Sequence, residues 1–118
     1  MKIMKKYIRL NHKIVFYVPS TNKAIYIGTI DYTRRITEVA NHLTKTFGGA
    51  TLETVKGYWK SSTGEYITED ITKVISFTSD ENLKKNLNNI LNYAKRKQLL
   101  YNQEALSIEI DNEFILID

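Results

Sequence analysis

The sequence TFGGAT at residues 46–51, followed by GYW at residues 57–59, decides the fold. Apolar side chains recur at helical spacing before it, so the paired glycines stand where an amphipathic helix ends. Gly48 or Gly49 is expected to adopt the left-handed conformation that ends many helices, because glycine has no Cβ to oppose it. An aromatic strand follows at once, so the stretch predicts a helix that turns directly into a sheet.

The helix is predicted to run from Asp31, its N-cap, to Phe47. Before it, IVFYV at residues 14–18 is a continuous apolar run, typical of a central strand that is buried on both faces. Residues 24–27 are expected to form a short edge strand. The apolar stripe of the helix consists of Tyr32, Ile36, Val39, Ala40, Leu43 and Phe47.

Residues 52–60 and 66–77 are the next predicted strands, and the small polar residues between them, with Gly64, predict a hairpin loop. A capping box formed by Thr78 and Glu81 predicts the start of a second helix. Its inward side chains are expected to be Leu83, Leu87, Ile90, Leu91 and Ala94.

Two more strands are predicted at residues 105–110 and 114–117, joined by a tight turn at Asp111 and Asn112. The first six elements then match the split βαβ pattern of ferredoxin-like domains. We therefore predict an α+β, ferredoxin-like fold with an extra C-terminal hairpin strand, in which an antiparallel sheet carries two helices on one face. Residues 1–118 are expected to form a single domain, with a basic N-terminal extension or edge strand at residues 1–12.

Composition sets the class of protein. The chain has 118 residues, of which 42% are hydrophobic and 25% charged, as in ordinary globular domains. It has no cysteine, so disulfides and thiolate metal sites are excluded. No apolar run reaches the roughly 20 residues that span a bilayer. We expect a cytoplasmic protein without a membrane partner.

Basic residues are concentrated at the N-terminus, where Lys5, Lys6, Arg9 and Lys13 occur without any acid. Such a cluster can contact phosphates or an acidic protein surface. It can equally belong to a solvated first strand that lies beside the acidic C-terminal hairpin, because the first and fourth strands are neighbours in this topology. Both interpretations stay open.

Four sequence words carry a family resemblance: VFYVPST at residues 15–21, FGGAT at 47–51, GYW at 57–59 and QEA at 103–105. They resemble words in a group of short proteins encoded on phages, prophages and plasmids of low-GC bacteria. The similarity runs from about residue 14 to the C-terminus, while residues 1–12 are an extension and the connector at 22–30 departs from the pattern. The resemblance implies a counter-defence setting, anti-CRISPR proteins included, and supplies no site residues.

The residue pattern gives little support for a catalytic or metal site. The glycine pair follows a helix, whereas phosphate-binding glycine loops precede one. With two histidines and no cysteine, neither a metal nor a cofactor is expected. The acids Glu65, Glu69 and Asp70 are best interpreted as a solvated strand end. An enzyme would instead require a pocket that encloses Glu69 or Asp70 beside a base.

A binding patch is the better-supported kind of site. Tyr58 and Trp59 point to opposite faces of their strand, and either could be the exposed aromatic. Lys56 and Lys60 share the face of Tyr58, and aromatic and basic residues together suit a protein interface or stacked bases. The aromatic signature of an RNA-recognition domain is absent from residues 73–77.

We therefore expect a non-enzymatic protein that inhibits a host defence component by binding it, with a Cas effector as the favoured partner. The alternative is a nucleotide or nucleic-acid binding protein, including a sponge for a cyclic-nucleotide defence signal. The C-terminal edge strand favours a homodimer by edge pairing, although Glu113 and Asp118 could equally prevent it.

Overall fold

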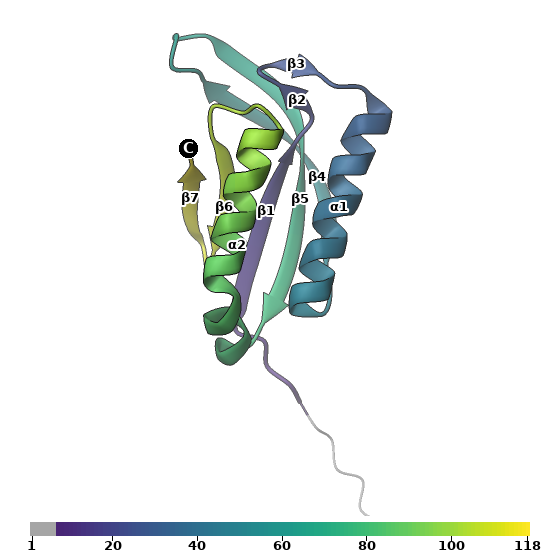
Figure 1. The fold of residues 1–118 in the computed structure, drawn as a ribbon, viewed down its shortest axis with the longest axis vertical. Helices are drawn as coiled ribbons and strands as arrows, with labels where there is room; N and C mark the ends of the chain where they lie inside the picture. The colour runs from purple at the N-terminus through teal and green to yellow at the C-terminus, as the bar shows by residue number, and fades with distance from the viewer. Residues whose placement is uncertain (1–6) are drawn as a thin grey trace, which may run out of the picture.

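The computed structural model describes residues 7–118. These residues form a five-stranded antiparallel sheet with strand order β4-β5-β1-β6-β7, a separate β2–β3 pair and two helices. Both helices cover the same face of the sheet (Figure 1). The elements are β1 (His12–Pro19), β2 (Thr21–Asn22), β3 (Ile25–Tyr26), α1 (Thr29–Phe47), β4 (Thr51–Lys60), β5 (Tyr66–Thr78), α2 (Asp80–Leu100), β6 (Leu106–Ile110) and β7 (Glu113–Ile117). The predicted α+β fold with its extra hairpin strand is confirmed.

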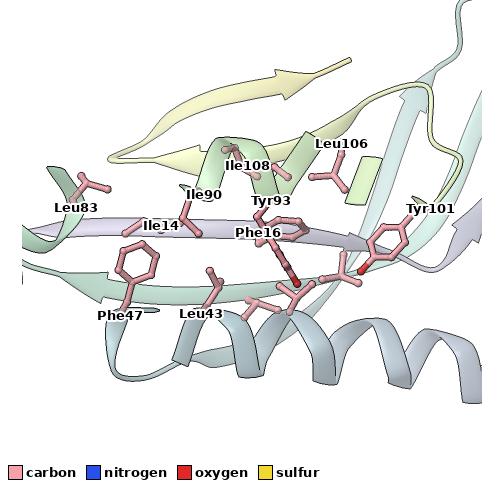
Figure 2. Packing of buried hydrophobic residues seen from close by; sticks show 14 residues of the cluster. Ile14, Phe16, Leu43, Phe47, Leu83, Ile90, Tyr93, Tyr101, Leu106 and Ile108 are labelled. Atoms are coloured by element: carbon pink, nitrogen blue, oxygen red, sulfur yellow. The ribbon is translucent and has the colours of Figure 1, made fainter. Parts of the chain in front are cut away.

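The core lies between the helices and the central strand β1. Ile14, Phe16 and Val18 point to the helices and are fully buried. Figure 2 shows this cluster, in which the Phe16 and Tyr93 rings meet edge to face with centroids 5.7 Å apart. The prediction for the second helix is wrong at Leu87, which is exposed.

The helix ends confirm one prediction and correct two. Gly48 ends α1 with φ 97°, a left-handed conformation that a side chain would oppose. The helix begins at Thr29 after Gly28, whereas Asp31 lies inside its first turn, 3.0 Å from Arg34. The N-cap of α2 is Ser79 in place of Thr78, and its side chain accepts a hydrogen bond from the Asn82 backbone N–H at 3.2 Å.

The sheet face opposite the helices carries no helix within residues 7–118 (Figure 1). Side chains alternate along a strand, so Val15, Tyr17 and Pro19 of β1 lie on this open face. In β5, the register with β1 and β4 places Glu69 and Ile71 there too. Outer strand β7 ends the sheet, and its pairing with a second copy stays a prediction.

The N-terminal end of β1 meets the C-terminal hairpin, as expected from the topology. Asp111 and Asn112 form the β6–β7 turn with φ of 52° and 69°. The His12 imidazole bridges two carboxylates, Asp111 at 2.5 Å and Asp80 at the start of α2. The Lys13 backbone N–H donates to Asp111 Oδ1 at 2.8 Å. This bridge ties three elements together.

Neither helix within residues 7–118 is long and apolar enough to cross a bilayer.

The His12 bridge predicts a pH-dependent stability. Hydrogen bonds to Asp111 and Asp80 raise the pKa of His12 above its usual 6.5. Its contribution is therefore fully present below about pH 6.5 and lost as the pH rises through the raised folded-state pKa. The urea midpoint should fall between about pH 5.5 and about pH 8.5, and His12→Gln should remove most of this dependence. An equal fall in the variant and the wild type would exclude the bridge as the cause.

Candidate active site

The open face contains a groove with a volume of about 630 Å³, between the β4–β5 hairpin and the β6–β7 hairpin. That volume is in the range of ligand-binding clefts. At one end, the Ser62 backbone N–H of the hairpin loop donates to the Glu104 carboxylate at 2.9 Å, which joins the two sides. The lining is mainly apolar and aromatic, with Tyr17, Pro19, Gly57, Trp59, Ile71, Leu106, Phe114 and Leu116 among its residues.

Glu69 is the buried acid of this groove, with only 6% of its surface exposed. Its Oε2 accepts a hydrogen bond from the Thr21 hydroxyl at 2.9 Å and another from the Trp59 indole N–H at 3.2 Å. Both donors are neutral, and no salt bridge to Glu69 occurs within residues 7–118. Carboxylates are seldom buried without a cation, because desolvation of the charge is costly. The arrangement therefore marks a candidate functional carboxylate.

Gly57 is paired with Glu69 across β4 and β5. A Cβ added at Gly57 would lie 2.3 Å from Cδ1 of Ile71, closer than atoms can approach. Glycine at this position therefore lets Ile71 fold over the β4 backbone and form the floor beside Glu69. The GYW word thus supplies both this glycine and the indole that holds the carboxylate.

An aromatic wall faces Glu69 from the other side of the groove. Tyr17 donates a hydrogen bond from its hydroxyl to Glu109, and its ring meets Phe114 edge to face with centroids 5.5 Å apart. Burial, followed by the bond to Glu109, raises the pKa of Tyr17 to about 12, so its hydroxyl stays neutral near pH 7. Aromatic faces of this kind attract cations and stack on nucleoside bases.

Three of the four sequence words meet at this groove. VFYVPST provides Tyr17 and Thr21, GYW provides Gly57 and Trp59, and QEA provides Gln103, another lining residue. These words are far apart in the chain, and the fold brings residues from all three to one groove.

The predicted binding patch lies on β4, next to the groove. Tyr58 is exposed, whereas Trp59 is half-buried in the groove, which settles the open choice between them. Lys56 forms a salt bridge with Asp70 at 2.8 Å, and Lys60 lies 5.8 Å from the Tyr66 ring. Lys56, Tyr58 and Lys60 are among the residues that line the groove, but the alternation along β4 turns their side chains to the opposite face of the sheet from Trp59.

The predicted basic N-terminal cluster lies elsewhere. Lys13 is paired with Phe77 of β5, and Tyr58 is paired with Thr68 of β5. These two positions are nine residues apart along β5, which corresponds to about 30 Å. Arg9 is exposed beyond the start of β1. Lys5 and Lys6 lie outside the described residues. Among the residues that the structure describes, the members of the two predicted sets of binding residues are not brought together.

The expectation that all three hairpin acids are solvated is wrong for Glu69. Glu65 and Asp70 are exposed, but the alternation along β5 turns Glu69 into the groove. The usable sequence signal was the alternation itself together with glycine and tryptophan on the neighbouring strand. Within residues 7–118, no three His, Cys, Asp or Glu side chains are grouped as metal ligands.

Comparison with known proteins links this fold to an enzyme. No family model and no curated protein sequence matches the chain. A solved structure of a phage SAM lyase in complex with S-methyl-5'-thioadenosine superposes with a TM-score of 0.66 at 16% identity, covering 99% of this chain and 92% of that one. The apo state of a phage SAM lyase gives a TM-score of 0.59 at 17% identity, with the same coverage.

This likeness shows a shared fold and corrects one expectation. The prediction of a non-enzymatic protein is contradicted, because both similar structures are of a lyase. The prediction of a non-enzymatic protein rested on the absence of an assembled catalytic set. An enzyme was expected to require a pocket that encloses Glu69 or Asp70 beside a base, and a groove with Glu69 in its lining is present. Both structures are of phage proteins; a mobile-element origin and a Cas effector as target stay predictions for this chain.

Substitutions at Glu69 should separate its charge from its hydrogen bonds. Both donors bind the same oxygen, so the amide oxygen of Glu69→Gln can accept both bonds, and the free energy of unfolding should change by less than about 1 kcal/mol. Glu69→Leu leaves the Thr21 hydroxyl and the Trp59 N–H without an acceptor and should cost about 2–4 kcal/mol. Urea denaturation of both variants measures the difference. Equal losses would contradict the described hydrogen bonding.

Proposed function

We propose that this protein is a lyase that cleaves S-adenosylmethionine and releases methylthioadenosine, with the open-face groove as its active site. The observation that carries the proposal is a buried carboxylate that forms no salt bridge with any described residue, in an aromatic groove, on the fold that phage SAM lyases share. One of those lyases was solved with the thioether nucleoside that such a cleavage would release.

The charges of the substrate suit this groove. S-adenosylmethionine carries an α-ammonium group and a sulfonium, and within residues 7–118 the buried Glu69 forms no ion pair that a cation would have to displace. The ammonium keeps its charge through the reaction, whereas the sulfonium loses it. A carboxylate against the sulfonium would stabilise the substrate more than the transition state, so Glu69 is assigned to the ammonium. The faces of Trp59 and Phe114 are left for the sulfonium and the adenine, since the Lys73 ammonium already lies 5.6 Å from the centroid of the Tyr17 ring.

The reaction needs no base in this assignment. An oxygen of the substrate's own carboxylate attacks its Cγ, a C–O bond forms as the Cγ–S bond breaks, and the electron pair of that bond passes to sulfur. The products are a five-membered lactone, which keeps the ammonium, and neutral methylthioadenosine. No proton or water molecule is consumed. The groove would act by holding the carboxylate in line with the breaking bond.

The direct test is incubation of the protein with S-adenosylmethionine, followed by chromatography and mass spectrometry for methylthioadenosine and the lactone. Loss of the ion pair to the ammonium in Glu69→Gln should lower kcat/KM about a hundredfold, mostly through KM. Glu65→Gln changes an exposed acid of the same hairpin outside the groove and serves as the matched control. An inactive wild-type protein would contradict the proposed function.

The assignment of Glu69 to the ammonium makes a separate prediction about binding. Methylthioadenosine lacks the ammonium-bearing part, so calorimetry should find the same affinity for it in the wild type and in Glu69→Gln. S-adenosylhomocysteine keeps the ammonium and should bind the variant more weakly by about tenfold or more. Equal weakening for both ligands would place Glu69 against the nucleoside.

A Cas-inhibiting role requires a different mechanism, since it would use an outer surface and no turnover. The Glu69→Gln variant keeps that surface and would retain such inhibition while losing cleavage.

Consumption of a methyl donor by a phage protein is itself a counter-defence activity in the general sense that the resemblance implies. Among the alternatives predicted, a nucleotide-binding protein comes nearer to this proposal than a nucleic-acid binder.

A further inference from the structure

Thr21 links the groove to a buried polar cluster behind it. Its hydroxyl donates to Glu69 at 2.9 Å, while its main-chain oxygen accepts from Arg35 Nη1 at 2.8 Å and from Gln103 Nε2 at 2.6 Å. Thr21 is 4% exposed. Thr21 is therefore hydrogen-bonded through its hydroxyl to the Glu69 carboxylate, and through its carbonyl to two side chains from distant parts of the chain.

The sheet does not fix Thr21. Its strand, β2, has two residues and pairs only with β3, outside the five-stranded sheet. The last main-chain link between this segment and β5 is the Ser20 N–H, which donates to the Asp70 carbonyl at 3.2 Å. Apart from its pairing with Tyr26 of β3, Thr21 is held in place beyond that point by the side chains that bind its carbonyl.

The two side chains are themselves well held. Arg35 of α1 also donates to the Pro19 carbonyl at 2.9 Å, and its guanidinium lies 4.2 Å from the centroid of the Tyr101 ring. Gln103 is 7% exposed and donates a second bond to the Tyr101 carbonyl at 3.2 Å. Such fixed donors can orient the groups they contact, as outer-shell partners do for metal ligands.

We propose that Arg35 and Gln103 are positioning residues for the reaction: they hold the Thr21 carbonyl so that the Thr21 hydroxyl aims the Glu69 carboxylate into the groove. This inference rests on the proposed function for its effect on catalysis. The placement of Glu69 itself is independent of the reaction and can be measured without substrate.

Trp59 provides that measurement. It is the one tryptophan of the chain, and its indole N–H donates to the same oxygen of Glu69 as Thr21 does. The ¹H–¹⁵N correlation spectrum therefore contains a single indole resonance that reports where the carboxylate lies. Thr21→Val should move this resonance, and Thr21→Ser, which keeps a hydroxyl, should move it less.

The test compares Arg35→Lys and Gln103→Met with the control Gln98→Met. Gln98 is buried to the same degree as Gln103 and donates to the Gln103 carbonyl at 2.5 Å, but makes no hydrogen bond to Thr21. Arg35→Lys and Gln103→Met should move the indole resonance in the direction of Thr21→Val and lower kcat/KM about tenfold to a hundredfold. Gln98→Met should lower the thermal midpoint as much as Gln103→Met, yet leave the resonance and the activity unchanged.

An unmoved indole resonance in Arg35→Lys and Gln103→Met would overturn the proposal, as would an equal displacement in Gln98→Met. If the wild-type protein does not cleave S-adenosylmethionine, the proposed function fails. The indole resonance would still decide whether Arg35 and Gln103 place Glu69.

Discussion

A buried carboxylate that forms no salt bridge within residues 7–118 is the constraint on which the rest of this structure depends. Glu69 loses most of its hydration and receives two neutral hydrogen bonds in return, which compensate only part of the cost. The surrounding chain has to keep Thr21 and Trp59 in place, and a cationic ligand would complete the compensation. The same feature therefore explains both the demands on the fold and the affinity proposed for an ammonium-bearing substrate.

The split βαβ topology makes room for this feature. Both helices pack on one face of the sheet around Phe16, so the opposite face stays open (Figure 1). The hairpins at the two ends of the strand order rise along the open face and form the walls of the groove. The central strand β1 serves both layers, because Phe16 belongs to the core and its neighbour Tyr17 to the groove. A sheet with helices on both faces would leave no such site.

The sequence predicted the fold well because its signals are local and periodic. The left-handed glycine after α1, the hairpin lengths and the turn at Asp111 each depend on a few adjacent residues. Helix starts were predicted less well, since Gly28 and Ser79 compete with nearby capping residues. The site was missed for a different reason. The alternation along β5 places Glu69 and Asp70 on opposite faces, but the burial of Glu69 depends on Thr21 and Trp59, 48 and 10 residues away, which no local pattern reveals.

The most direct measurement of the central claim is a crystal structure of the protein with S-adenosylhomocysteine, which keeps the ammonium but cannot react as the sulfonium does. The account predicts that its amino group lies within hydrogen-bond distance of the Glu69 carboxylate, about 3 Å, with the nucleoside against the aromatic wall. A ligand bound outside the open-face groove, or bound in it with the amino group away from Glu69, would contradict the account.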